Sequence, residues 1–375
     1  MFIKGFEQYF KIYEFIKTDK FQIIPEGSSI PTSGVVKFGV DPTGPELHLG
    51  HLIPILMVKK LKDNGMDVHI VLGSMTAMLG DPSGRNTMRP MLTLSQTKSN
   101  ADKILIQIKR ILGNDITIHY NHEWFEKMTL PDMIQILSKY TVDYLMSRDA
   151  FQKRKEEGGT IGMHELIVPI LQGLDSVELK ANVEVGGTDQ LFNFLLSREV
   201  QTKSGQAPEI CILSPIINGT DGRKMSKSFG NCIFINDTPT DVFGKCMSIS
   251  DTLMHEWYPL FVDSYDNKQH PMELKKNLAV IVTNVIWGEG KGEEERSKFE
   301  RNVQSKNVPT DIKEYPSKDI VEFIRSITNC SRGEARRLMA QNAVSIDGNK
   351  ITDNEYVVKP GETVKVGKRN YGKAI

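Results

Sequence analysis

A strand–helix–strand pattern near the start of the chain restricts its fold more than any other feature. Residues 35–40 are short, apolar and β-branched, which predicts a buried strand. Residues 50–64 place apolar side chains at helical spacing, Gly65 follows at the expected C-cap, and residues 68–73 predict a second strand. This order predicts a parallel sheet with a right-handed crossover. Ligands of such sheets bind beyond the carboxyl ends of the strands, so we expect functional residues in the loops there.

Length and composition narrow the class of protein. The chain has 375 residues, more than one ordinary domain, and its 39% apolar and 25% charged residues are typical of a globular protein with a sizeable core. This composition excludes a disordered or collagen-like chain. Lysine and arginine number 47, as do aspartate and glutamate, so a nucleic-acid partner has to be argued from a local basic face. The four cysteines form no C-x-x-C pair, and we predict no structural metal.

Hydropathy gives no indication of a membrane protein. No segment approaches about 18 uninterrupted apolar residues, so no membrane span is expected. Residues 1–17 mix charged and aromatic side chains and lack the apolar core and cleavage site of a signal peptide. The aromatic residues up to about Thr18 recur at helical spacing and predict an amphipathic helix. We therefore expect a cytoplasmic protein.

The pattern of predicted elements changes twice along the chain, which predicts three domains. Residues 1–236 fit an α/β domain built on a Rossmann-like parallel sheet. Residues 237–312 have a mostly helical pattern, and residues 317–375 fit a small α+β domain with short strands.

The first motif, His48-Leu49-Gly50-His51, lies just after the first predicted strand and opens the first predicted helix. A helix N-terminus carries free N–H groups and a partial positive charge, which suit phosphate. Gly50 lets a ligand approach the backbone, and the two imidazoles project from the same turn. Taken alone, such a four-residue pattern is more often explained by helix capping or core packing than by ligand binding.

The second motif is a basic loop, Lys224-Met225-Ser226-Lys227-Ser228. Its two lysines suit the neutralisation of a polyphosphate, although an isolated basic loop is also compatible with a solvated surface.

Together, the two motifs resemble the HxGH and KMSKS signatures of class I aminoacyl-tRNA synthetases, and the residues around them narrow the resemblance to tyrosyl-tRNA synthetases. The resemblance runs from about residue 30 to the end, where the last segment is similar to an S4-type RNA-binding domain. The other segments that carry it are Phe38-Gly39-Val40-Asp41-Pro42-Thr43, Gly80-Asp81-Pro82-Ser83-Gly84-Arg85, Leu171-Gln172-Gly173-Leu174-Asp175 and Gly186-Gly187-Thr188-Asp189-Gln190.

This resemblance implies a reaction in two steps. The carboxylate of the amino acid attacks the α-phosphate of ATP, giving an aminoacyl-adenylate and pyrophosphate, and a terminal ribose hydroxyl of tRNA then attacks the acyl carbon. Neither step needs a protein nucleophile, so catalysis would rest on positioning and on neutralising phosphate charge. Mg²⁺ would accompany ATP, bound by phosphate and water more than by protein.

The resemblance also implies which residues bind the nucleotide. The residues implied at the phosphates and the reacting phosphorus are Thr43, His48, His51, Arg85, Arg89, Lys224 and Lys227. The residues implied around the rest of ATP are Gly39, Asp41, Gly50, Gly187, Asp189, Met225 and Ser226. Among these, Gly187 and Asp189 would face the ribose of the adenylate.

A third group of residues is implied around the amino acid: Lys37, Thr76, Asp81, Val168, Gln172, Asp175 and Gln190. Three of them, Asp81, Thr76 and Gln172, match positions that hold the substrate ammonium. Asp175 matches the carboxylate that accepts the phenolic hydroxyl of tyrosine, and Gln190 would face the substrate carboxyl group. Lys37 stands where one branch of the family has lysine and the other has a hydroxyl-binding tyrosine.

The pocket also departs from the family pattern, and this leaves two substrate hypotheses open. Val168 and Leu174 replace usual tyrosines, and Leu166 stands where phenylalanine is common. One hypothesis is a tyrosine ligase whose pocket has drifted with compensation. The other is a paralogue that activates a non-standard aromatic or other amino acid, because a tyrosine hydroxyl lost from the ammonium site removes a hydrogen bond of about 1.5–3 kcal/mol.

The last segment predicts an RNA-binding surface. Ser331 and Glu334 form a capping box ahead of a helix that carries Arg332, Arg336 and Arg337. Six lysines and five arginines against seven acidic residues give residues 317–375 a net charge of +4. Backbone phosphate binding is the expected use, with tRNA as the partner.

The resemblance also implies a homodimer formed through the segment near Tyr140 to Phe151.

A third hypothesis for the function, beside the tyrosine ligase and the paralogue, is a non-catalytic RNA-binding protein built on an inactive synthetase. The motif residues that such a protein would not need are intact, which argues against it: His48, His51, Lys224, Lys227 and Asp81.

Overall fold

The structure is a computed structural model that describes residues 20–79, 91–262, 265–301, 312–367 and 370–375. It separates into two units, Met1–Arg296 and Ser297–Ile375, and each is described by itself. The helix predicted up to Thr18 and the three predicted site residues Asp81, Arg85 and Arg89 lie outside the described residues. No helix of the part that the structure describes has the length and hydropathy needed to cross a bilayer.

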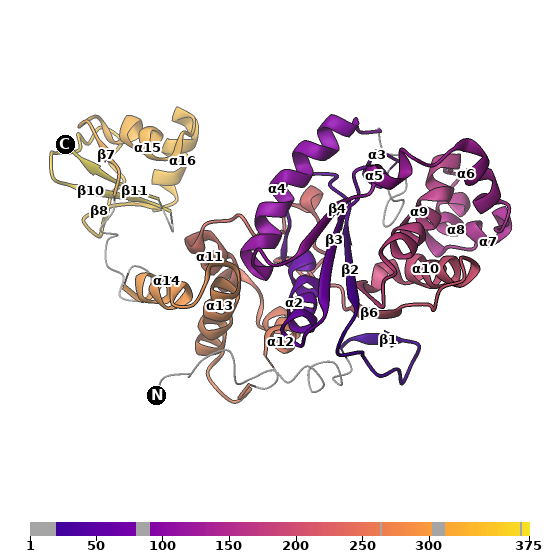
Figure 1. The fold of residues 1–375 in the computed structure, drawn as a ribbon. Coiled ribbons are helices and arrows are strands. Elements are labelled where there is room, and N and C mark those ends of the chain that lie inside the picture. The colour runs from indigo at the N-terminus through magenta and orange to yellow at the C-terminus, as the bar shows by residue number, and fades with distance from the viewer. Residues whose placement is uncertain (1–19, 80–90, 263–264, 302–311, 368–369) are drawn as a thin grey trace. The chain divides into compact units, whose positions relative to one another are not determined.

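A six-stranded sheet forms the centre of the first unit, in the order β1-β6-β5-β2-β3-β4 (Figure 1). Strand β1 pairs antiparallel with β6, and the other neighbours are parallel. The predicted parallel strands are confirmed, because Val35 pairs with Asp67 and Val40 with Leu72 in a continuous register. The strands are β1 (Gln22–Ile24), β2 (Val35–Val40), β3 (Asp67–Leu72), β4 (Thr117–Tyr120), β5 (Val183–Gly187) and β6 (Ile210–Ser214).

Helix α2 (Leu49–Asp63) connects β2 to β3 and confirms the predicted crossover helix, with ends that differ by one residue. Its apolar residues, including Leu49 and Leu52, are fully buried. Gly65, just beyond the helix end, has φ +95°, a left-handed conformation that a glycine adopts without strain. This turn brings the chain directly into β3.

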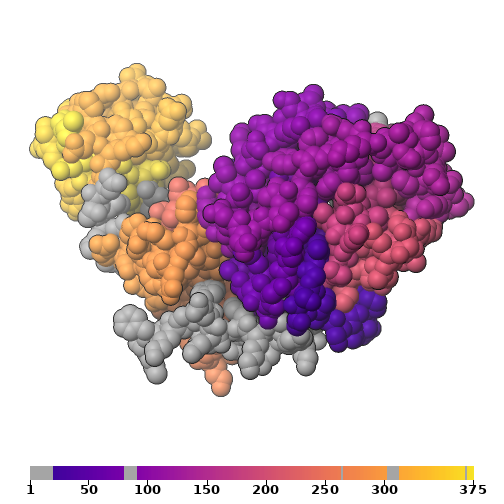
Figure 2. All heavy atoms as spheres, in the orientation of Figure 1, coloured from indigo at the N-terminus to yellow at the C-terminus, as the bar shows by residue number. Residues whose placement is uncertain are grey.

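In the order of the chain, the other helices of the sheet region come after β3 and before β6. Helices α9 and α10 pack against each other, and with α6 to α8 they gather on one side of the unit, in magenta to red in Figures 1 and 2. The helices are α3 (Thr76–Leu79), α4 (Leu94–Leu112), α5 (His122–Phe125), α6 (Leu130–Leu137), α7 (Val142–Met146), α8 (Asp149–Glu156), α9 (Met163–Leu179), the 3₁₀ turn η2 (Thr188–Gln190) and α10 (Leu191–Lys203).

The chain becomes helical after the sheet, as predicted. After the 3₁₀ turn η3 (Lys227–Phe229), the helices are α11 (Pro239–Ser248), α12 (Asp251–Phe261), α13 (Pro271–Trp287) and α14 (Lys291–Phe299). Helices α11 to α13 belong to the same unit as the sheet, and a domain boundary at residue 237 remains a prediction.

The second unit has its own α+β fold. Its five-stranded sheet has the order β7-β11-β10-β8-β9, and a separate apolar core lies between the sheet and two helices. Ser331 caps the second helix by accepting a hydrogen bond from the backbone N–H of Glu334, as predicted. The elements are β7 (Glu314–Tyr315), α15 (Ile320–Thr328), α16 (Arg332–Ala340), β8 (Val344–Ile346), β9 (Asn349–Lys350), β10 (Thr363–Val366) and β11 (Asn370–Ala374).

Candidate active site

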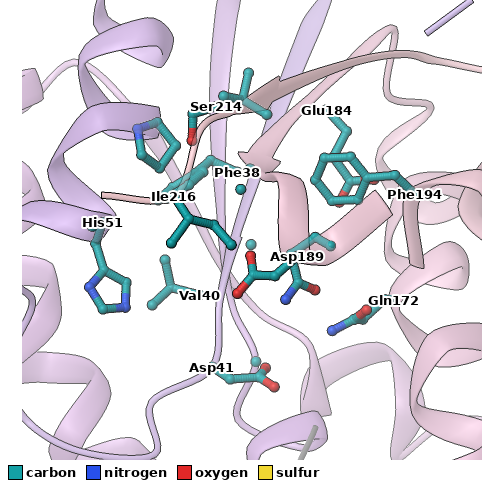
Figure 3. A pocket seen from close by; sticks show the side chains of 18 of the residues that line it. Phe38, Val40, Asp41, His51, Gln172, Glu184, Asp189, Phe194, Ser214 and Ile216 are labelled. Atoms are coloured by element: carbon teal, nitrogen blue, oxygen red, sulfur yellow. The ribbon is translucent and has the colours of Figure 1, made fainter. Parts of the chain in front are cut away.

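A pocket of about 350 Å³ lies at the carboxyl ends of β2, β5 and β6, where a parallel sheet is expected to bind its ligand. Figure 3 shows His51 on one side of it, Gln172 on the other and Asp189 between them. The predicted site residues that line it are Lys37, Gly39, Asp41, Thr43, His48, Gly50, His51, Thr76, Gln172, Asp175, Gly187, Asp189, Gln190, Lys224 and Met225. The pocket therefore joins the nucleotide-binding and the amino-acid-binding groups of the prediction.

The HxGH motif forms the N-terminal cap of α2. His48 Nδ1 accepts a hydrogen bond of 3.1 Å from the backbone N–H of Gly50, and His51 Nδ1 accepts one of 3.2 Å from the N–H of His48. A neutral imidazole that accepts at Nδ1 carries its proton on Nε2. Capping and ligand binding are thus compatible, because the cap uses one nitrogen of each ring and leaves an Nε2–H donor.

Both imidazoles are neutral at physiological pH. Burial lowers the pKa of His48 to about 2, with further lowering by His51, Lys227 and Lys224. Burial also lowers the pKa of His51 to about 4, and Lys227 adds to this effect. These rings can therefore donate hydrogen bonds to phosphate oxygens without adding charge, and the lysines supply the positive charge.

The KMSKS loop folds against the pocket and is fixed by Asn231. The Asn231 side chain accepts a 2.9 Å hydrogen bond from Ser226 N and donates one of 2.7 Å to Asp221. Met225 is buried and lines the pocket together with Lys224. The loop thus has a defined conformation that presents both lysines.

The two lysines of this loop lie near the other motif. Lys224 Nζ is 3.3 Å from Asp189 Oδ2, so it reaches the middle of the pocket. Lys227 is not among the lining residues, nor is Ser226, but Lys227 acts on the pKa of both histidines. Its Nζ is also 3.1 Å from the position that a Cβ on Gly44 would take. A larger side chain at residue 44 would therefore displace this ammonium.

Asp175 lies at the closed end of the pocket and is held by two residues that the sequence did not indicate. Trp124 Nε1 donates to Asp175 Oδ1 at 3.0 Å, and Asn121 Nδ2 is 3.3 Å from Oδ2. Both donors come from the turn after β4 and its helix α5. Burial raises the pKa of Asp175 to about 7, although Lys37 and these two donors oppose the rise.

A chain of hydrogen bonds connects Asp41, Thr76 and Asn121 with Asp175. Thr76 Oγ1 donates to Asp41 at 2.6 Å and accepts from Asn121 at 3.2 Å. Asn121 thereby links the Thr76–Asp41 pair to Asp175. Gln190 Oε1 accepts a 2.7 Å hydrogen bond from Asn193 at the start of α10.

None of the three positions that depart from the family pattern is among the described residues that line the pocket. Leu166 and Leu174 pack in an apolar cluster with residues of α7, α8 and α10. Val168 is fully buried and is not one of the described lining residues.

The three predicted RNA-binding arginines lie on α16 of the second unit. Arg332 forms an ion pair of 2.5 Å with Glu322, and Arg337 forms one of 2.9 Å with Glu334. Arg336 is exposed and makes no ion pair among the described residues.

The fold and pocket define the class of protein first: it is a Rossmann-like α/β protein whose pocket, at the carboxyl ends of the parallel strands, is lined by imidazole and lysine side chains from two separate segments. The family model of class I tRNA synthetases (W and Y) matches residues 32–303, and that of the S4 domain matches residues 320–364. The chain therefore belongs to the class I tRNA synthetases of the tryptophan and tyrosine family and carries an S4 domain.

Relatives agree with this assignment. The chain is 39% identical over 360 residues to the tyrosine–tRNA ligase of Dehalococcoides mccartyi, an alignment that covers 91% of each chain. It is 40% identical over 356 residues to that of Thermotoga maritima, covering 90% of this chain and 89% of the relative.

Solved structures have the same fold. A truncated mitochondrial tyrosyl-tRNA synthetase of Aspergillus nidulans aligns with a TM-score of 0.61 at 21% identity, covering 72% of this chain and 86% of that one. The Archaeoglobus fulgidus enzyme complexed with L-tyrosine aligns with a TM-score of 0.56 at 19% identity, covering 71% and 90%.

Proposed function

We propose that this protein activates tyrosine with ATP and transfers the tyrosyl group to the 3′ end of its tRNA. One observation carries the proposal. The HxGH turn, the KMSKS loop and the Asp175 carboxylate border a single pocket, so phosphate-binding groups and an acceptor for a phenolic hydroxyl face the same space. The relatives at about 40% identity are tyrosine–tRNA ligases, which supports the same substrate.

In the first step, the side chains position the reactants and neutralise charge. The Nε2–H groups of His48 and His51 donate to oxygens of the α-phosphate as it becomes pentacoordinate. Lys224 and Lys227 are proposed to bind the β- and γ-phosphates, and Arg85 and Arg89 to add positive charge. Lys224 has to exchange Asp189 for phosphate as ATP enters.

Thr43 is proposed to contact the phosphates, and the glycines Gly39, Gly50 and Gly187 are proposed to give the nucleotide close access to the backbone. Asp189 is proposed to bind the adenylate ribose, with Asp41, Met225 and Ser226 completing the ATP site. Mg²⁺ is proposed to arrive with ATP and to be held mainly by phosphate oxygens and water, where it would neutralise phosphate charge. The described residues contain no group of three or more His, Cys, Asp or Glu side chains placed to hold a metal ion.

At the amino-acid end, Asp175 is proposed to accept the phenolic hydroxyl and Gln190 to bind the carboxyl group. The ammonium is assigned to Thr76, Gln172 and Asp81. Lys37 is proposed to shape the wall around the ring, and Val168 to support that wall from the core behind it. Leu166 and Leu174 pack toward the helical layer, so the positions that motivate a different substrate do not reshape the described wall. This placement favours tyrosine over a non-standard amino acid.

The second unit is proposed to bind tRNA through Arg332, Arg336 and Arg337. Arg332 and Arg337 are already paired with carboxylates, so Arg336 is the arginine most available to a phosphate. We place the reaction in the cytoplasm.

A homodimer is also proposed, through the helical layer that includes the predicted segment near Tyr140 to Phe151. Helix α6 buries none of its residues in the single chain. Exposed apolar side chains of this layer are Leu130 (72%), Ile134 (57%), Val142 (58%), Tyr144 (39%) and Met163 (75%). A second copy of the chain would remove this surface from water.

The function is tested by ATP–pyrophosphate exchange with purified protein and a panel of amino acids that includes tyrosine, phenylalanine, tryptophan and modified tyrosines. Exchange with tyrosine alone supports the proposal. Exchange with a modified aromatic amino acid and not with tyrosine would favour the paralogue. No exchange with any amino acid, with tRNA binding retained, would favour the non-catalytic protein.

A further inference from the structure

A cluster of buried polar side chains lies at the closed end of the pocket, and its two glutamates have no part in the reaction described above. It consists of Lys37 on β2, Ser176 on α9, Glu184 on β5 and Glu209 just before β6. Each residue is at most 4% exposed. Lys37 and Glu184 also line the pocket, and Figure 3 labels Glu184 among the lining side chains.

Every N–H group of the Lys37 ammonium is already used within the protein. Its Nζ donates to Gln172 O at 3.0 Å and to Ser176 Oγ at 2.5 Å, and it pairs with Glu184 Oε1 at 2.8 Å. An ammonium has three donors, so none is left for a substrate hydroxyl. Lys37 therefore contributes charge to the pocket, and direct recognition of a hydroxyl falls to Asp175.

One oxygen on each of the two glutamates lacks a hydrogen-bond donor in the part of the chain that the structure describes, and this feature of the cluster needs an explanation. The Oε2 atoms of Glu184 and Glu209 are both buried, and neither has a donor among the described residues. Their carboxyl groups are nevertheless close enough for a hydrogen bond to each other. Two carboxylates cannot make that bond, but a carboxylic acid and a carboxylate can, and one proton satisfies both oxygens.

The surrounding contacts indicate which glutamate carries the proton. Glu184 forms an ion pair with the Lys37 ammonium at 2.8 Å. Among the described residues, the partner of Glu209 Oε1 is the uncharged Ser176 hydroxyl, which donates to it at 2.9 Å. The Oε2 atom of Glu209 is buried without a donor among the described residues, and both burial and the Glu184 charge raise the pKa of Glu209 well above its usual value. Cys211 lies near both glutamates as a buried thiol, and Arg198 donates to the main-chain oxygen of Glu209.

We propose that Glu209, as a carboxylic acid, donates a hydrogen bond to Glu184, and that these two positioning residues hold Lys37 so that Asp175 stays free to accept a substrate hydroxyl. This inference deepens the proposed function and rests on it.

The physical reason is the competition between Lys37 and the substrate for Asp175. Lys37 and Asp175 are close enough for each charge to act on the other. Asp175 already accepts from Asn121 and Trp124, so a lysine released from Glu184 would take its remaining acceptor positions. The glutamate pair keeps the positive charge near the carboxylate and prevents a direct ion pair. The result is a pocket that binds a hydroxylated ring in preference to a plain one.

The experiment compares three variants of the full-length protein: Glu209→Gln, Glu209→Met and Glu184→Met. Glutamine reproduces the neutral acid, with one acceptor for Ser176 and one donor for Glu184, whereas methionine is similar in size and has neither. The readouts are the KM for tyrosine, the KM for ATP and the ratio of kcat/KM for tyrosine over phenylalanine, all in ATP–pyrophosphate exchange. The KM for ATP serves as the internal control because the proposal assigns the pair to the amino-acid end of the pocket.

We expect the three values of Glu209→Gln to stay within about twofold of those of the unaltered protein, because the glutamine N–H can donate to Glu184 as the carboxylic acid O–H does. We expect Glu184→Met to raise the KM for tyrosine and to lower the tyrosine-over-phenylalanine ratio by about tenfold or more, the loss of one hydrogen bond to a charged group. Glu209→Met should lower the same ratio by a smaller factor. An unchanged ratio in Glu184→Met, or a Glu209→Gln variant as impaired as Glu209→Met, would overturn the proposal.

Infrared difference spectroscopy at pH 7 tests the proton directly and does not depend on activity. The unaltered protein should show a buried carboxylic-acid C=O band that Glu209→Gln lacks, and the absence of that band from the unaltered protein would also overturn the proposal. If the unaltered protein exchanges no tyrosine but shows the band, the proposed function fails while the protonated pair stands.

Discussion

Burial shifts the pKa values of single residues in this site more than the charges of their partners do. Burial is the largest effect on the pKa of His48, His51 and Asp175, and it favours the neutral form in each case. Neutral imidazoles suit donation to phosphate, and the fixed positive charge then comes from the exposed lysines of the KMSKS loop. Hydrogen bonding to phosphate and neutralisation of its charge are thus assigned to different side chains.

Lys227→Ala should slow adenylate formation without an equal loss of amino-acid binding. The Lys227 ammonium lies near Gly44 and acts on the pKa of both HxGH histidines, and it is not among the described residues lining the pocket, so the proposed role places its charge at the pyrophosphate and not at the amino acid. We expect kcat in pyrophosphate exchange to fall by about 10²–10³ while the KM for tyrosine changes little. Lys59→Ala, which removes an exposed lysine paired with Asp63 on α2, is the matched control. Equal losses in kcat and in tyrosine binding would contradict the assigned role.

Asp175 predicts a specific pH dependence of stability. Its pKa is raised from 3.8 to about 7, so between these values the folded state holds a proton that the unfolded state has lost. The free energy of unfolding contributed by this group therefore falls as the pH rises through that range. Asp175→Asn removes the titration, so the stability of the variant relative to the unaltered protein should increase from pH 4 to pH 8. The increase should be at most on the order of 4 kcal/mol, at about 1.4 kcal/mol per pKa unit.

Urea denaturation of both proteins at four or five pH values measures this difference. A difference that does not change with pH would show that Asp175 titrates normally in the folded protein.

At the level of elements, the N-terminus of α2 combines a structural and a chemical role. His48 caps the helix through Nδ1, and its Nε2–H is the group assigned to phosphate. Asparagine is a favoured N-cap residue but cannot place a donor where Nε2 lies. His48→Asn should therefore keep the thermal stability and lose much of the exchange rate, whereas His48→Ala should lose the rate and about 1 kcal/mol of stability. Equal stability losses in both variants would argue against the cap.

Helix α6 carries the prediction for assembly. Ile134 is 57% exposed in the single chain, as expected for a residue that a second copy covers. Ile134→Asp should convert a dimer to a monomer in sedimentation equilibrium without lowering the stability of the monomer. Ile106→Asp, on a 64% exposed isoleucine of α4 away from this layer, is the control. If the unaltered protein already sediments as a monomer, the assignment of this face is wrong.

At the level of the whole molecule, the chain separates adenylate formation from RNA binding into two units, each with its own core. Deletion of residues 317–375 should leave pyrophosphate exchange within about twofold, because none of the described residues that line the pocket lies beyond Met225. The rate of tRNA charging should fall strongly, and more at high salt, since phosphate contacts release counterions. Charging that is unaffected by the deletion would show that the first unit alone binds tRNA.

The sequence by itself determined the parallel sheet, the crossover helix and most of the pocket-lining residues. These follow from local patterns: β-branched strands at 35–40 and 68–73, a capped helix between them, and two motifs whose residue types suit phosphate. Parallel strands end at one edge of the sheet, so the loops that hold His48 and Asp189 had to meet there.

The tertiary structure alone decided how the closed end of the pocket is built. Asn121 and Trp124 hold Asp175 from a position more than 50 residues away in the chain, and no local pattern distinguishes them from other polar and aromatic residues. The same is true of Glu184 and Glu209, which in the sequence are two ordinary glutamates. Their role depends on burial next to Lys37, and burial of a charged group is a property of packing that residue order does not express.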